Sequence, residues 1–124
     1  MNPDNYGTPK ACRDLLNAGI FIETDFYWPI DGEEKLFSKY QMDRFYNPAY
    51  FMPAPSLAEM WRELPETIKT GPSTWKHLTT EKMGPRMEAY YRPCELKDLK
   101  SSENPTDALI YLRIWIEKME GTGE

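Results

Sequence analysis

The side chains with the strongest chemistry in this sequence are one histidine and two cysteines. His77 is the only histidine, and Cys12 and Cys94 lie far apart, without the spacing of a CxxC motif. A structural zinc ion needs four nitrogen or sulfur ligands, and three such residues cannot supply them. A cysteine–histidine nucleophile pair can form between distant positions, but neither cysteine has a recognisable catalytic context. We therefore expect no such metal site and two reduced thiols in the core.

Carboxylates are the remaining candidates for catalysis. Glu23 and Asp25 share one face of an expected strand, and Asp31, Glu33 and Glu34 lie at an expected turn. Paired acids can serve as general acid and base. Oxygen ligands can bind a divalent cation, but this spacing is not that of an EF-hand loop. We expect no catalytic residue and no cofactor, and we keep a small enzyme with a carboxylate site as an alternative.

The aromatic residues near the middle of the chain offer binding chemistry instead. In the segment 39–51 these are Tyr40, Phe45, Tyr46, Tyr50 and Phe51. Aromatic side chains are enriched at protein interfaces, and they can also stack on nucleobases where cations accompany them. The chain has 15 basic and 20 acidic residues, however, and its net charge of −5 opposes binding to a phosphate backbone. We predict a protein-interaction surface, with nucleic-acid binding by this segment as the alternative.

These residues must be positioned by a sheet, and the sequence predicts two β-hairpins for it. Residues 20–28 alternate between two faces with the period of a strand, and residues 36–42 form a weaker partner after a turn. Residues 75–82 and 86–92 flank a Met-Gly-Pro turn, which is the pattern of a second hairpin. Three prolines exclude 43–55 from a central strand. We expect this segment to be an extended connector, which either covers the core or exposes its rings.

The helix with the clearest limits is expected over residues 57–64. Ser56 and Glu59 have the spacing of a capping box, in which each side chain accepts a hydrogen bond from the other residue's backbone amide. Trp61 belongs to an apolar stripe at helical spacing. Because so short a helix is marginal alone in water, we expect Trp61 to dock in the core.

Two further helices are expected over 9–18 and 105–119, each beginning with a cap residue followed by proline. On the last of them, Ile110 and Ile114 project to the side opposite the main apolar face. Either the connector folds over these two isoleucines, or they form the surface of a weak two-fold homodimer. We include both in the candidate interaction surface.

The fold class predicted from these elements is α+β, an antiparallel sheet of two β-hairpins covered by three short helices, in a single domain of residues 1–124. No run approaches the ~20 apolar residues of a membrane span. The opening MNPDNYGTPK lacks the basic and apolar regions of a secretory signal. We therefore expect a cytoplasmic protein without a membrane partner.

Several stretches together resemble a known group of proteins. They are LLNAG-IF at the end of the first helix, the aromatic strand, the helix entry APSLAEMW and the terminal helix DALIYLRIWIE. This order is similar to that of small bacteriophage and prophage proteins of gut anaerobes. Ser56 stands where threonine is commoner in that group, and Asn17-Ala18 stand where charged residues are usual. The resemblance spans nearly the whole chain and implies an α+β domain of phage-related origin, but its motifs are structural and imply no activity.

The function predicted from these observations is that of a non-catalytic accessory protein. Without a catalytic constellation, and with a surplus of aromatic anchors, the chain is expected to bind a host or phage protein in the cytoplasm of the bacterial host.

Overall fold

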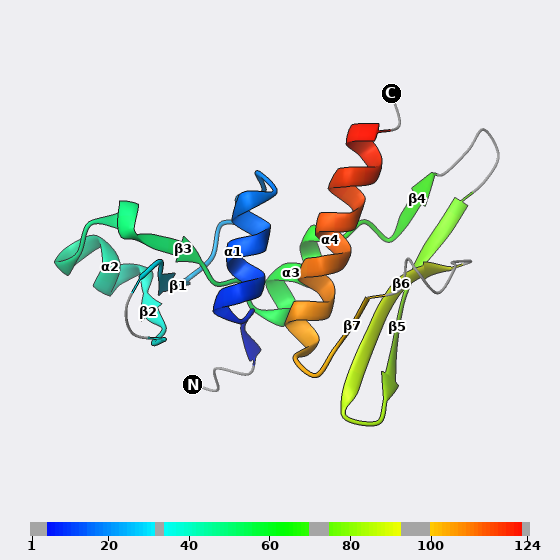
Figure 1. The fold of residues 1–124 in the computed structure, drawn as a ribbon, viewed down its shortest axis with the longest axis horizontal. Coiled ribbons are helices and arrows are strands. Elements are labelled where there is room, and N and C mark those ends of the chain that lie inside the picture. Colours follow the sequence, from blue (N-terminus) through cyan, green and yellow to red (C-terminus); the bar gives the residue numbers. More distant parts are fainter. Residues whose placement is uncertain (1–4, 32–33, 70–74, 93–99, 123–124) are drawn as a thin grey trace.

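The computed structural model describes residues 5–31, 34–69, 75–92 and 100–122, and its fold is α+β, as the sequence predicts. In these residues the chain forms four α-helices and two antiparallel sheets, rather than three helices over one sheet (Figure 1). The helices are α1 (Pro9–Asn17), α2 (Lys39–Phe45), α3 (Leu57–Glu63) and α4 (Pro105–Thr122). A three-stranded sheet has the order β2-β1-β3, with β1 (Phe26–Pro29), β2 (Phe37–Ser38) and β3 (Phe51–Pro53). A four-stranded sheet has the order β4-β5-β6-β7, with β4 (Thr67–Lys69), β5 (Trp75–Met83), β6 (Arg86–Arg92) and β7 (Lys100–Ser102).

The centre of the fold is α4, which packs on β6, β7, α3 and α1. Figure 1 shows α1, α3 and α4 lying between the two sheets. The side chains of α4 are buried around most of the helix circumference, at Ala108, Leu109, Ile110, Leu112, Ile114 and Ile116. A helix that is apolar on nearly all sides is covered on nearly all sides. This explains why the terminal helix carries two apolar stripes.

Ile110 and Ile114 are both buried, so they do not belong to an interaction surface. They are covered within the same chain by α1 and the residues before it, which neither of the two predicted alternatives included. A Cβ atom placed on Gly7 would lie 2.4 Å from Cδ1 of Ile110 and 2.9 Å from Sγ of Cys12. Only a glycine allows the chain to pass so close to the isoleucine.

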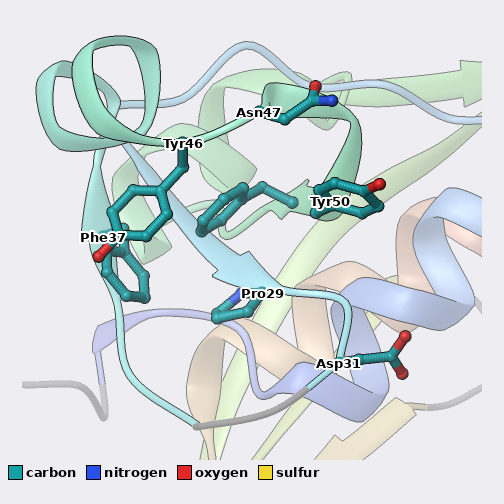
Figure 2. A pocket seen from close by; sticks show the side chains of 7 residues that line it. Pro29, Asp31, Phe37, Tyr46, Asn47 and Tyr50 are labelled. Atoms are coloured by element: carbon teal, nitrogen blue, oxygen red, sulfur yellow. The ribbon is translucent and has the colours of Figure 1, made fainter.

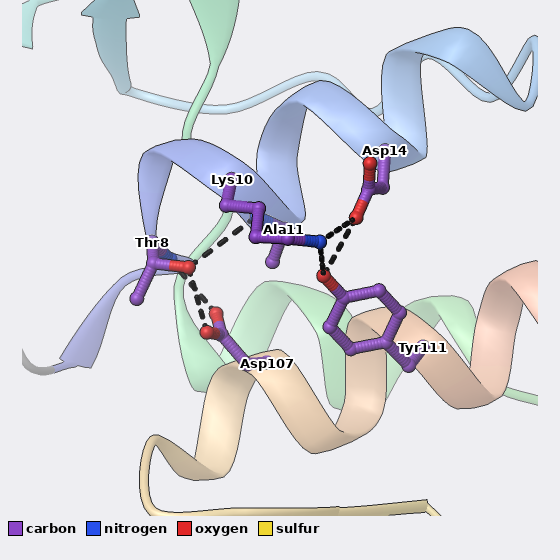
Figure 3. Close-up of polar contacts among 6 residues, drawn as sticks. All are labelled: Thr8, Lys10, Ala11, Asp14, Asp107 and Tyr111. Atoms are coloured by element: carbon purple, nitrogen blue, oxygen red, sulfur yellow. Dashed lines mark hydrogen bonds and ion pairs between the residues drawn. The ribbon is translucent and has the colours of Figure 1, made fainter.

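A polar contact spanning nearly the whole sequence joins α1 to α4 (Figure 3). The Thr8 backbone amide and hydroxyl donate to the two carboxylate oxygens of Asp107, at 2.8 and 2.7 Å. One turn further along, the Tyr111 hydroxyl donates to Asp14 at 2.7 Å, and the Lys10 ammonium lies 2.9 Å from the same carboxylate oxygen. These bonds, with Tyr111 first, lower the pKa of Asp14. The contact fixes the register of the two helices.

The capping box at the start of α3 is confirmed, but the prediction for Trp61 is wrong. The Ser56 hydroxyl accepts from the Glu59 amide at 3.1 Å, and a Glu59 carboxylate oxygen accepts from the Ser56 amide at 2.9 Å. Met60 and Leu64 are buried, whereas Trp61 is 48% exposed. Among the helices, α3 packs mainly on α4. The residues of its apolar stripe that become buried are Met60 and Leu64, and Trp61 stays at the side of the helix. The indole lies at the edge of a groove beside the β5–β6 hairpin.

The first predicted hairpin is wrong in most of its length. Residues 20–25 alternate between buried and exposed as expected, yet they have no strand partner among the described residues, and β1 begins only at Phe26. The predicted second strand ends at Ser38, because Ser38 and Gln41 form a capping box that begins α2. The connector 43–55 contains the end of α2, a short 3₁₀ helix (Pro48–Tyr50) and the edge strand β3.

The second hairpin is confirmed. The strands β5 and β6 pair from His77↔Arg92 to Met83↔Arg86, and Gly84 takes a φ of +59° in the turn, where glycine is favoured. Ala89 and Tyr91 on one face are buried against the helices. The opposite face carries no buried residue among those described.

Candidate interaction pocket

Three aromatic rings meet beside the three-stranded sheet. Phe37, Tyr46 and Phe51 make pairwise edge-to-face contacts, with ring centroids 5.2, 5.3 and 5.6 Å apart. They come from β2, from the residue that ends α2, and from β3. Such T-shaped pairs place the positive edge of one ring against the negative face of another.

The backbone that carries these rings is held by short-range hydrogen bonds. The side chain of Asn47 accepts from the Ala49 amide at 3.0 Å and begins the 3₁₀ turn at Pro48–Tyr50. The Tyr50 carbonyl then accepts from the Ile30 amide at 2.8 Å, next to the pairing of Pro29 with Phe51. The turn therefore brings the 46–51 segment alongside the end of β1.

A pocket of about 290 Å³ opens between these segments (Figure 2). Its lining residues are Pro29, Asp31, Phe37, Tyr46, Asn47, Tyr50 and Phe51. Phe37 and Tyr46 lie together at one end, and Tyr50 and Asp31 lie toward the other. Tyr50 is 69% exposed and Tyr46 is 50% exposed. Tyrosine rings so accessible contribute little to the core, so their arrangement around a pocket points to binding.

The rings and the carboxylate together favour a cationic group. Aromatic faces carry partial negative charge and attract cations, and Asp31 is an exposed carboxylate at the pocket edge. The protein uses this attraction internally at two places in the same region. Lys35 Nζ lies 5.8 Å from the centroid of Phe37, and the guanidinium of Arg44 lies 5.7 Å from that of Tyr40.

The structure brings together three of the residues predicted for the interaction surface, namely Tyr46, Tyr50 and Phe51. Tyr40 is exposed on α2 but does not line this pocket, and the side chain of Phe45 is outside the described residues. Ile110 and Ile114 lie in the core, as described above.

The sequence reasoning missed Pro29, Asp31, Phe37 and Asn47 as pocket residues. One signal was available for Phe37. It immediately precedes the cap residue Ser38, which is the position where a hydrophobic side chain commonly packs back onto the first turns of a helix.

The structure describes several of the residues that were considered for catalysis or metal binding. Cys12 is buried in the core, where desolvation raises the pKa of its thiol to about 12, and this keeps it protonated and unreactive. His77 is exposed on the open side of the four-stranded sheet. Glu23 and Asp25 are exposed in the irregular segment before β1. Cys94 and Glu33 are outside the described residues.

Two further kinds of site are absent from the part of the chain that the structure describes. There, no group of three or more histidine, cysteine, aspartate or glutamate residues could hold a metal ion. No helix in these ranges has the length and apolar character needed to cross a bilayer.

Comparison with known proteins provides no relative for this arrangement. No protein-family model, no curated protein and no solved structure matches the chain.

Proposed function

We propose that this chain is a non-catalytic accessory protein of a bacteriophage or another mobile element, which binds a host or phage protein in the cytoplasm of the bacterial host. The observation that supports it best is the pocket beside the three-stranded sheet, which four aromatic rings line and which has Asp31 at its edge (Figure 2). The phage-related origin depends on the sequence resemblance alone.

The pocket takes one side chain of the partner, and that side chain is cationic. A volume of about 290 Å³ is at the lower limit of small-molecule sites, which commonly range from roughly 300 to 1,000 Å³. It suits a lysine, a methylated lysine or an arginine better than a whole cofactor. The aromatic faces attract such a cation, and Asp31 supplies the opposite charge at the pocket edge.

The test is a titration of the protein with three short peptides that differ only at one residue, which is lysine, trimethyllysine or acetyllysine. The two cationic peptides should bind and shift the resonances of Tyr46 and Tyr50, and the neutral acetyllysine peptide should not. Tyr50→Ala should weaken binding by about 0.5–2 kcal/mol, the range of a cation–π contact at sites of increasing burial. Asp31→Asn should weaken the binding of both cationic peptides as well.

Tyr40→Ala is the matched control, because Tyr40 is an equally exposed tyrosine of the same region that does not line the pocket. This variant should bind as the wild type does. Equal binding of the acetyllysine peptide would contradict the cationic specificity. An equal loss in Tyr40→Ala and Tyr50→Ala would contradict the pocket as the site.

A further inference from the structure

The four-stranded sheet has one face that none of the described helices covers. We call it the open face. The described strand register places on it Thr67, Lys69, Trp75, His77, Thr79, Glu81, Met83, Arg86, Glu88, Tyr90 and Arg92. Not one of these residues is buried, whereas Ile68, Ala89 and Tyr91 on the reverse face are.

Aromatic and cationic side chains gather at one end of the open face. The register pairs Lys69 with Trp75, then His77 with Arg92, and then Thr79 with Tyr90. We call Lys69, Trp75, His77, Tyr90 and Arg92 the stacking end. Residues two apart on a strand are about 7 Å apart and point the same way. Three rings therefore project side by side from neighbouring positions of one surface.

The charge of the stacking end is opposite to that of the whole chain. Lys69 and Arg92 lie in its three rows of paired residues, and the described residues of these rows include no carboxylate. The chain as a whole carries a net charge of −5. The first acids on this face, Glu81 and Glu88, stand one row further along, where the Tyr90 hydroxyl donates a hydrogen bond to Glu81. A cationic region on an acidic protein favours an anionic partner.

The rings of the stacking end differ in exposure: Trp75 and His77 are exposed, and Tyr90 is partly buried. Trp75 is 52% exposed, and Lys69 Nζ lies 5.6 Å from the centroid of its ring. The stacking end is separate from the aromatic pocket beside the three-stranded sheet and from the groove at Trp61, which other residues line. Residues that dominate protein–protein binding generally sit in packed pockets. Nucleobases instead stack on exposed aromatic rings, and a nearby cationic groove or patch follows their phosphates.

We infer that the stacking end binds single-stranded nucleic acid, with bases stacked on Trp75 and Tyr90 and phosphates held by Lys69 and Arg92. This surface is separate from the 39–51 segment and from the pocket of the proposed function. The binding depends little on base identity, because every base presents a flat ring to stack. Two cations on an acidic protein make it weak, and the dependence on salt is measurable but shallow because only two phosphates are contacted.

The experiment measures the anisotropy of a labelled oligothymidylate of about 12 nucleotides between roughly 20 and 200 mM salt. Two phosphate contacts predict a slope near −1.4 in a plot of log affinity against log salt, at about −0.7 per contact for single strands. Lys69→Ala should reduce that slope to about −0.7. Trp75→Ala should weaken binding about tenfold, the loss of one stacked base.

Two variants serve as controls for Trp75→Ala. Trp61→Ala removes a similarly exposed indole outside the open face, and Met83→Ala removes an exposed residue from the other end of β5 on the same face. Both should bind the oligonucleotide as the wild type does. Tyr50→Ala should also leave this binding unchanged, so failure of the pocket and failure of the stacking end are distinguishable.

Three results would overturn the inference. The first is no binding at the lowest salt. The second is an equal affinity of the wild type and Trp75→Ala, with circular dichroism showing that both are folded. The third is competition by an acidic polyglutamate peptide as strong as that by unlabelled oligonucleotide, because charge alone would then account for binding and an acidic polypeptide would be the partner.

Discussion

Tyr91 of the four-stranded sheet and two tyrosines beside the three-stranded sheet have opposite surroundings. In the four-stranded sheet, Tyr91 is almost completely buried, its ring stacks 6.4 Å from that of Trp115 on α4, and its hydroxyl donates to the Pro65 carbonyl at 2.6 Å. Beside the three-stranded sheet, the rings of Tyr46 at the end of α2 and Tyr50 in the 3₁₀ turn remain half or more exposed around a pocket. The residue type is the same, and what differs is whether a helix packs over it.

The same difference affects how each sheet is held. The four-stranded sheet has strands of nine and seven residues that pair along their length and place one face on α4. The three-stranded sheet has strands of four, two and three residues. So short a sheet depends on anchors, and one of them is Trp28, whose indole nitrogen donates to the Gly7 carbonyl at 2.7 Å. We expect substitutions in the four-stranded sheet and around α4 to lower the free energy of unfolding most.

The largest expected effect is that of Tyr91→Ala. Removing a fully buried aromatic ring should lower the free energy of unfolding by about 3–5 kcal/mol. Tyr46→Ala, beside the three-stranded sheet, should lower the free energy of unfolding by less than about 1 kcal/mol, as is usual for exposed positions. Urea denaturation of both variants measures the difference. Equal losses would show that the exposed rings are structural, and the contrast between the sheets would then be wrong.

A smaller effect is expected at the point where α1 approaches α4. Gly7→Ala places a methyl group against Cδ1 of Ile110, and such overpacking should cost about 1–3 kcal/mol. Ile110→Val removes that Cδ1 atom. The double variant should therefore be more stable than the sum of the two single losses predicts. Simple additivity in urea melts would mean that the two residues do not press on each other.

The smallest effect is expected from Tyr111→Phe, which removes the hydrogen bond to Asp14. The loss should be only about 0.5 kcal/mol, since the carboxylate is 37% exposed and solvent replaces part of the bond. The bond lowers the pKa of Asp14 in the folded state, so its contribution is present at pH values above the unfolded pKa and disappears as the pH falls through the folded value. The wild type and the variant should therefore differ at pH 7 and converge in acid. A difference that is constant from pH 7 to pH 2 would contradict this explanation.

Local signals in the sequence determined the helix starts and the second hairpin. The Thr8, Ser56 and Asn104 caps all form, because a cap satisfies backbone amides within three residues of itself. The turn at Gly84 forms for a similarly local reason, since glycine adopts a positive φ without strain. The alternation from Ile20 to Asp25 correctly predicts which side chains are buried, even though that segment pairs with no strand of the described chain.

Tertiary structure decided which apolar side chains are core and which are surface. Three residues from segments of helical or aromatic pattern illustrate this. Trp61 is half exposed, Ile110 is fully buried, and Tyr46 lines a pocket. Their burial depends on elements far away in the sequence, such as α1, which covers Ile110. The pocket itself joins residues 29–51 through the pairing of β1 with β3. Spacing along a chain reports local geometry, whereas a second layer of packing is set only when the whole chain folds.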